Sequence, residues 1–150
     1  MRILVDADAF PGVLRRILFK ASERLEIPVV MVANKYIRTP DSPLVSTLLA
    51  AAGPDEADDK IVEEIQPGEL VITADIPLAD RVVEKGAYAI SPRGDLFTVT
   101  NIKQRLATRD LMAQLRSQGM ETGGPPGFSQ KDCQVFANQL DRFLAKHCRR

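Results

Sequence analysis

The feature that most constrains this chain is a series of short apolar runs separated by segments with helical periodicity. Continuous apolar runs of this length are typical of parallel strands that helices cover on both faces. Alternating strands and helices build right-handed βαβ units. We therefore predict an α/β fold of three layers, in which helices flank a mainly parallel central sheet. The expected strands are Arg2–Val5, Val29–Ala33, Leu70–Thr73 and Tyr88–Ile90.

The segments between these runs carry signals for helices. Pro11–Leu25 places apolar residues at helical spacing, with a proline in its first turn. Asp55–Ile65 begins with acidic residues, which favour the positive end of a helix dipole. Asp75 can cap a helix that runs to about Lys85, and Gly86 can take the left-handed conformation that ends many helices.

Two further segments have mixed signals. Leu44–Ala51 is rich in Leu and Ala, which favour a helix, but it is short and bounded by Pro and Gly-Pro. The alternating context favours a strand, and we predict one there. Ser91–Thr100 contains the turn signal Pro-Arg-Gly-Asp and is expected to form a hairpin or a sheet edge.

From about residue 101 the chain is predicted to be helical. Asn101 and Gln104 have the spacing of a capping box, and Ser129 is expected to cap the final helix. Gly119–Phe128 is predicted to be the loop between these helices. No segment is long enough to act as a linker, so we predict one domain over residues 1–150.

The composition argues against several classes of protein. No apolar run approaches the roughly 20 residues of a membrane-spanning helix, and the N-terminus lacks the layout of a signal peptide. We therefore expect a cytoplasmic protein with no membrane partner. Cys133, Cys148 and the single histidine, His147, do not have the spacing of a zinc finger, so we expect free thiols and a surface histidine.

The net charge is zero, but the charges are unevenly distributed. Residues 1–100 hold 11 Lys/Arg and 16 Asp/Glu, whereas residues 101–150 hold 9 and 4. An acidic part that binds metal, followed by a basic part that contacts phosphate, would suit a phosphate-containing substrate. A chance imbalance on solvated helix faces explains the same distribution equally well.

Several of the predicted strands are followed by aspartates. The carboxyl ends of parallel strands meet at one edge of the sheet, so these aspartates should lie along that edge. Grouped carboxylates repel one another and resist ionisation unless a cation lies among them. Oxygen ligands favour Mg²⁺ or Mn²⁺ over zinc, and such ions can promote phosphodiester cleavage. We therefore predict a Mg²⁺ or Mn²⁺ site. Its candidate ligands are Asp6, Asp8, Asp55, Asp58 and Asp75.

Most of these aspartates also have a structural explanation. Asp75 is in the position of an ordinary N-cap, and Asp8 could cap the helix that begins near Pro11. Asp55 and Asp58 complement a helix dipole. Asp6 is harder to explain in this way, because it closes a buried strand where an unpaired charge is costly.

Other polar residues near this edge are candidates for substrate binding. Thr73 lies two residues before Asp75 and could orient a ligand. The residues that could contact phosphate are Asn34, Lys35, Arg38 and Arg93. For each of them, a solvated surface position is the alternative interpretation.

Over almost its whole length the sequence resembles the YaiI/YqxD family of uncharacterised bacterial proteins. The most specific shared stretch is Val71–Ala79, with the sequence VITADIPLA. The other shared stretches are Val5–Ala9, Val32–Asn34, Ser42–Pro43, Gly53–Asp58, Pro92–Gly94, Thr122–Pro125 and Phe136–Arg142.

The YaiI/YqxD family is similar in fold to PIN-like nuclease domains, so the resemblance implies a three-layer PIN-like fold. In those domains, acids after the first strand, in a mid-chain helix and in a Thr-x-Asp sequence after a later strand bind Mg²⁺ or Mn²⁺. The resemblance implies that Asp6, Asp58 (or Asp55) and Asp75 are the catalytic acids, with Thr73 beside the last of them. The candidates for a fourth acid are Asp8, Asp80 and Asp95.

Three functions are compatible with these residues. The first is a Mg²⁺- or Mn²⁺-dependent nuclease that hydrolyses phosphodiester bonds of RNA or single-stranded nucleic acid, with the basic terminal helices steering the backbone. The second is a phosphatase of the haloacid-dehalogenase type, in which Asp6 forms an aspartyl-phosphate and Asp8 acts as acid and base. The third is a non-catalytic PIN-like module for binding or regulation.

Overall fold

Six strands form one sheet in the order β3-β2-β1-β4-β5-β6. The computed structural model describes residues 1–53, 55–117 and 129–147. All neighbouring strands are parallel except β5 and β6, which are antiparallel. The sequence-predicted strands are confirmed, including the one in Leu44–Ala51 and the edge hairpin in Ser91–Thr100. The strands are β1 (Ile3–Asp6), β2 (Val29–Ala33), β3 (Val45–Leu49), β4 (Leu70–Ile72), β5 (Tyr88–Ile90) and β6 (Leu96–Phe97).

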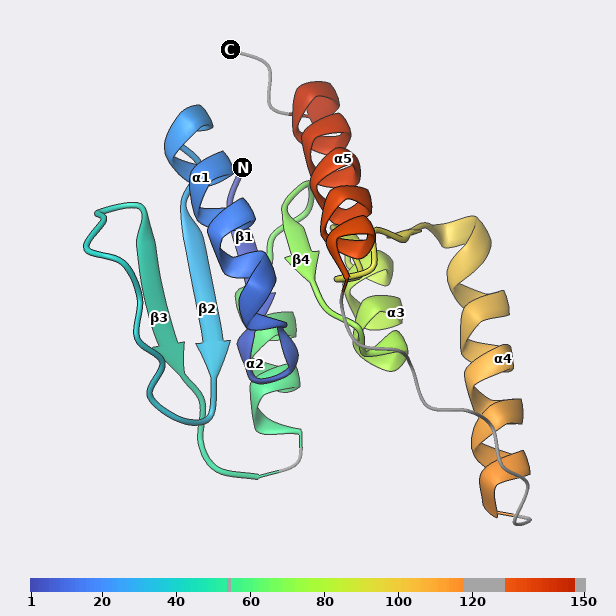
Figure 1. Ribbon diagram of the computed structural model, residues 1–150. Coiled ribbons are helices and arrows are strands. Elements are labelled where there is room, and N and C mark those ends of the chain that lie inside the picture. Colours follow the sequence, from blue (N-terminus) through green and yellow to red (C-terminus); the bar gives the residue numbers. More distant parts are fainter. Residues whose placement is uncertain (54, 118–128, 148–150) are drawn as a thin grey trace.

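Helices cover both faces of the sheet and complete the three-layer α/β fold. In Figure 1, α1 and α5 lie in front of the sheet, α2 and α3 lie behind it, and α4 lies beside α3 at the far edge. The helices are α1 (Arg15–Leu25), α2 (Glu56–Glu64), α3 (Ile76–Glu84), α4 (Val99–Ser117) and α5 (Gln130–His147). Two 3₁₀ turns, η1 (Ala7–Ala9) and η2 (Gly12–Leu14), connect β1 to α1.

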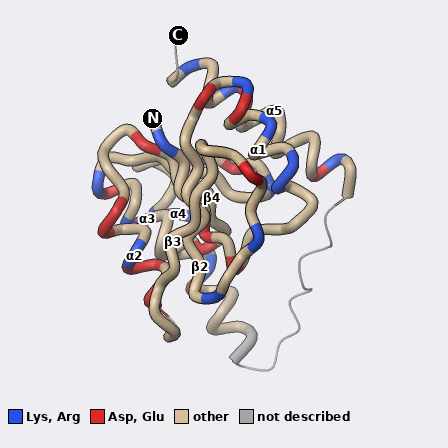
Figure 2. Tube along the Cα trace, turned by 90° about the vertical axis from the view of Figure 1, so that its left-hand side faces the viewer, with Lys and Arg blue, Asp and Glu red and all other residues tan. Residues whose placement is uncertain are grey.

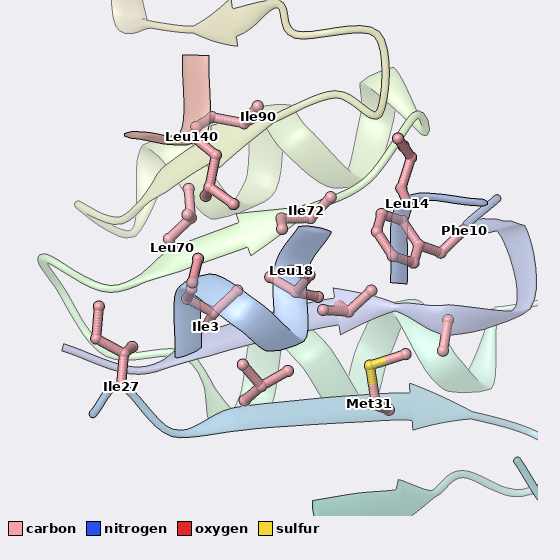
Figure 3. Close-up of a cluster of buried hydrophobic side chains, with 14 of the residues drawn as sticks. Ile3, Phe10, Leu14, Leu18, Ile27, Met31, Leu70, Ile72, Ile90 and Leu140 are labelled. Atoms are coloured by element: carbon pink, nitrogen blue, oxygen red, sulfur yellow. The ribbon is translucent and has the colours of Figure 1, made fainter. Parts of the chain in front are cut away.

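The central strands are apolar throughout because each face of the sheet has its own hydrophobic core. In β1, Ile3 and Val5 point into the core beneath α1 and α5, whereas Leu4 points into the core beneath α2 and α3. Figure 3 shows the first of these cores, a buried cluster to which the sheet contributes Ile3, α1 contributes Leu18 and α5 contributes Leu140. Side chains alternate between the faces of a strand, so two buried faces require an uninterrupted apolar run.

Two sequence-based helix starts are wrong. The segment from Pro11 begins as a 3₁₀ turn, and the α-helix starts only at Arg15. At α4, the capping box joins Thr98 and Asn101, not Asn101 and Gln104. The backbone N–H of Asn101 donates to Thr98 Oγ1 over 3.1 Å, and that of Thr98 donates to Asn101 Oδ1 over 2.9 Å. The helix starts earlier because β6 already ends at Phe97.

The capping predictions at two other helices are confirmed. Asp75 accepts a hydrogen bond from the Leu78 N–H at 3.0 Å, and Gly86, just after α3, has a φ of +92°. Ser129 and Asp132 form a reciprocal capping box at the start of α5.

Three further sequence-based predictions concern the C-terminal part of the chain. Cys133 is a free thiol, whereas Gly119–Phe128 and Cys148 lie outside the described residues. His147 is half-buried against the rings of Tyr88 and Phe143, so the expected surface position is confirmed only in part. Among the helices of residues 1–53, 55–117 and 129–147, none has both the length and the apolar character that a membrane crossing requires.

Candidate metal centre

The candidate site lies where β1 and β4 end side by side. These neighbours are parallel, with Val5 paired to Ile72. After β1 the chain passes to α1 on one face of the sheet, and after β4 it passes to α3 on the other face (Figure 1). Such a point, where the chain direction reverses between adjacent strands, opens a crevice at the carboxyl ends, which is where α/β sheets generally bind ligands.

Asp6, Thr73 and Asp75 are linked by hydrogen bonds at this crevice. The Thr73 hydroxyl donates to Asp6 Oδ2 over 3.0 Å, and the backbone N–H of Asp75 donates to Thr73 Oγ1 over 3.0 Å. Asp6 is 8% exposed and Thr73 is 1% exposed. Asp6 Oδ1 accepts no hydrogen bond from any described residue. One oxygen of this buried carboxylate is therefore fixed by the protein, and the other is available to a ligand.

Asp8 is held on the β2 side of the same crevice. Its Oδ2 accepts a hydrogen bond of 2.9 Å from the backbone N–H of Asn34, the residue that follows β2. Asp8 does not cap α1, since it lies within η1, and η2 follows before that helix begins. The contact places Asn34 at the site through its backbone.

Asp58 comes to the site from the first turn of α2. Its pKa is raised to about 6, chiefly by burial and then by the negative charges of Asp75, Asp6 and Asp55, against the opposing charge of Arg81. Asp55 precedes the helix, and its side chain makes no capping hydrogen bond. The five predicted ligands are therefore close enough to form one electrostatically coupled cluster.

The pKa of Asp6 is also raised. Burial is the main cause, and the charges of Asp75 and Asp8 act in the same direction, whereas the hydrogen bond from Thr73 lowers it. Mutual repulsion is what carboxylates experience when they share a site without a compensating cation. A divalent ion would remove this repulsion.

The donor set fits Mg²⁺ or Mn²⁺ by its chemistry, since it consists of carboxylate oxygens. The side chains do not form a finished coordination shell. Among the residues that the structure describes, no three acidic, histidine or cysteine side chains converge closely enough to hold a metal ion as placed. The role of these aspartates as metal ligands therefore stays a prediction.

The other candidate residues are distributed over different parts of the molecule. Lys35 lines a shallow cavity next to β3, and Arg38 is exposed. Arg93 lies in the turn between β5 and β6 and forms an ion pair with Asp132 of α5, at 3.7 Å. Arg93 also lines a cavity together with Ala74 and Ile76, the neighbours of Asp75 in the chain. A role of these three side chains in substrate binding stays a prediction.

The candidates for a fourth acid differ in their surroundings. Of the three, only Asp8 acts on the pKa of Asp6. Asp80 pairs with Lys103 of α4, and Asp95 pairs with Arg105 of the same helix. The structure thus favours Asp8 as the fourth acidic member of the cluster.

Sequence reasoning missed one residue of the site. Arg81 of α3 forms an ion pair of 2.9 Å with Asp59 of α2, and its charge opposes the raised pKa of Asp58. It is the cation that α3 supplies to the acidic cluster. Nothing in the sequence marks Arg81, because it meets α2 only through the packing of two helices on the same face of the sheet.

The charges differ from one helix to the next. Figure 2 shows mainly acidic positions along α2 and positions of both signs on α5, whereas α1 carries four basic residues and one acidic residue. Several basic residues of α4 are paired with acids. Lys103 bonds Asp80 and Glu84, and Arg109 bonds Asp110.

The fold and this site define a doubly wound α/β protein with coupled aspartates at the reversal point of its sheet. The chain belongs to the family described as "Uncharacterized BCR, YaiI/YqxD family", whose sequence profile matches residues 4–146. A UPF0178 protein of Burkholderia cenocepacia is 55% identical over 150 residues, which cover 100% of both chains. A UPF0178 protein of Hahella chejuensis is 55% identical over 146 residues, 97% of each chain. No solved structure matches this chain.

Proposed function

We propose that this chain is a Mg²⁺- or Mn²⁺-dependent nuclease that hydrolyses phosphodiester bonds of RNA or single-stranded nucleic acid. The observation that carries the proposal is the electrostatic coupling of Asp6, Asp58 and Asp75. These residues come from β1, α2 and the start of α3, and their carboxylates act on one another where β1 and β4 end. The family's similarity to PIN-like nuclease domains, which place acids at equivalent points of the fold, supports the same interpretation.

Each aspartate has a distinct part in the proposed site. Asp6 is the fixed ligand, because Thr73 holds one of its oxygens. Asp75 uses Oδ1 to cap α3, so Oδ2 is the oxygen with which it would bind the metal ion. Asp58 is partly buried and is repelled by three other aspartates, so its ionisation gains most from a cation. When bound, the ion supplies the positive charge that allows an anionic phosphodiester to approach this acidic site and polarises the scissile bond.

The basic residues of α4 supply the proposed attraction for the nucleic acid backbone. Lys103 is 60% exposed and Arg109 is 52% exposed, and both lie in ion pairs with acids at the surface. Exposed ion pairs contribute little to stability, so phosphate groups can replace the acids as partners. Binding of nucleic acid should consequently weaken steeply with increasing salt.

The test combines metal binding with cleavage. Mn²⁺ is titrated calorimetrically into the wild type and into Asp6→Asn, Asp58→Asn and Asp75→Asn, and cleavage of an end-labelled single-stranded RNA is followed with Mn²⁺ present. Asparagine preserves the shape of each side chain and still accepts the hydrogen bonds of Asp6 and Asp75. We expect each variant to lose both Mn²⁺ affinity and cleavage.

The matched control is Asp41→Asn, which removes an exposed aspartate of the β2–β3 loop and should behave as wild type. Equal Mn²⁺ affinity in wild type and Asp6→Asn would rule out the proposed metal site. Mn²⁺ binding without cleavage of RNA or DNA would instead support the non-catalytic binding module. A phosphorylated Asp6 after incubation with a phosphate monoester would support the phosphatase, although no contact among the described residues specifically favours it.

A further inference from the structure

We infer that the cavity beside the aspartates binds one unpaired nucleotide of the substrate strand, which makes the enzyme specific for single strands. This inference rests on the proposed nuclease function and adds the site that would bind the nucleotide and select an unpaired strand. The cavity has a volume of about 310 Å³. It lies between the loop after β1, the start of α3, the β5–β6 turn and α4.

The cavity adjoins the candidate metal centre. Ala74 and Ile76, which line it, are the residues on either side of Asp75. Ala9, which also lines it, follows Asp8 directly. A nucleotide in the cavity would therefore have its phosphate near the aspartates.

The walls of the cavity combine apolar surfaces with arginines. The half-buried Pro11 and Ile76 provide apolar contacts for a planar base, and the buried ring of Phe97 lies beneath the cavity wall. The guanidinium of Arg105 lies 6.0 Å from the centre of the Phe97 ring, which holds this charge at the cavity wall. Stacking on apolar and aromatic groups together with a cation is the usual way in which proteins hold unpaired bases.

The arginine at this wall can exchange its partner for a phosphate. Arg105 pairs with Asp95 over 3.5 Å, and their side chains are 46% and 44% exposed. A long, exposed ion pair of this kind is weak. A phosphate offers a better partner, because a guanidinium can bind two of its oxygens at once. Arg105 is therefore the residue that recognises the phosphate of the bound nucleotide.

The size of the cavity favours one unpaired nucleotide. A volume of about 310 Å³ lies at the lower end of the roughly 300–1,000 Å³ that is typical of small-molecule sites, which suits a single small ligand such as one nucleotide. A base in a duplex would have to leave its stack and its partner to enter, at a cost that favours strands already unpaired. An unpaired strand offers its bases without this cost.

The first part of the test measures nucleotide binding without metal. Adenosine 5′-monophosphate is titrated in EDTA, with calorimetry for affinity and the methyl NMR signal of Ile76 as a local reporter. We expect saturable binding that shifts the Ile76 signal. Arg105→Gln should weaken binding about tenfold, which corresponds to about 1.4 kcal/mol. Ala74→Leu, which adds volume at an exposed position of the cavity wall, should also weaken it.

The matched control is Arg24→Gln on α1, which also removes an exposed arginine from an ion pair but lies outside the cavity, and it should bind the nucleotide as wild type does. The second part compares Mn²⁺-dependent cleavage of one RNA sequence as a single strand and as a blunt duplex, and we expect faster cleavage of the single strand. Equal cleavage of both forms, absence of nucleotide binding, or unchanged binding in Arg105→Gln and Ala74→Leu would each overturn the inference. If the nucleotide binds as expected but no RNA is cleaved, the nucleotide site stands and the nuclease proposal fails.

Discussion

The hydroxyl of Thr73 donates a hydrogen bond of 3.0 Å to Oδ2 of Asp6, joining the ends of β4 and β1. The Thr73 hydroxyl oxygen also accepts the backbone N–H of Asp75, so one small side chain connects two of the proposed metal ligands. Both Thr73 and Asp6 are buried. A buried carboxylate needs such a donor, since water cannot reach it freely.

Thr73→Val should destabilise the fold, because it removes this donor while preserving the shape of the side chain. We expect the free energy of unfolding at pH 7 to fall by about 1–3 kcal/mol, as measured by urea denaturation. Thr73→Ser keeps the hydroxyl and is the control, with most of the stability retained. Equal stability of the Val and Ser variants would mean that the hydrogen bond contributes little.

The raised pKa of Asp58 predicts a pH-dependent stability in the absence of divalent metal. Its pKa is 3.8 in the unfolded chain and about 6 in the folded protein. Between these values the folded protein holds a proton that the unfolded chain has released, so this group's contribution to the free energy of unfolding decreases as the pH rises. Above pH 6 the charged carboxylate is partly buried beside Asp75, Asp6 and Asp55, with Arg81 as a partial counter-charge.

Asp58→Asn should therefore raise the melting temperature at pH 7.5 and have little effect near pH 3.8. The measurement is thermal unfolding in EDTA over this range, with Asp41→Asn as the control for the loss of one exposed negative charge. If the difference in melting temperature between wild type and Asp58→Asn does not change with pH, the pKa of Asp58 is not raised in the folded protein.

Phe136→Ala should be among the most destabilising substitutions in the C-terminal helix. Phe136 is fully buried and packs edge-to-face on Phe10, with ring centres 6.1 Å apart. Removing a buried aromatic ring leaves a cavity and costs about 3–5 kcal/mol, measurable by urea denaturation. The neighbouring Val135 is 43% exposed, so Val135→Ala should cost far less. If both variants lose a similar amount of stability, the side of α5 that carries Phe136 does not pack in the core.

Gly94→Ala should separate the β5–β6 turn from α5. Gly94 has a φ of +90°, and a Cβ there would lie 2.7 Å from Cγ1 of Val135 and 3.1 Å from its carbonyl oxygen. The strained backbone alone costs of order 1–3 kcal/mol in the free energy of unfolding. Gly12→Ala is the matched control, since nothing lies within 4 Å of the position that its added methyl group would take.

Adding Val135→Ala to Gly94→Ala should restore part of the lost stability, because the shorter side chain relieves one of the two close contacts. A double-mutant cycle on the free energies of unfolding measures this coupling. Strictly additive effects would show that the turn and α5 are not in contact at these residues.

The sequence was sufficient to predict most of the fold. Strands that are buried on both faces must be continuously apolar, so runs such as Val29–Ala33 stand out without any knowledge of their partners. The strand in Leu44–Ala51 was predicted from its context, since its composition favoured a helix. The capping box at α4 was placed three residues too late, because Thr98–Asn101 and Asn101–Gln104 offer similar chemistry and only the end of β6 decides between them.

The sequence alone determined that acidic side chains would gather at the carboxyl edge of a parallel sheet, because local apolar and polar patterns fix where each strand ends. Only the tertiary structure decided that Thr73 holds Asp6, that Arg81 faces the acidic cluster and that a cavity opens beside Asp75. These relationships depend on contacts between segments that are far apart in the chain, such as Asp6 and Thr73, which are 67 residues apart. The pairing of β1 with β4 and the packing of the helices on the two faces of the sheet set such distances, and no local pattern encodes them.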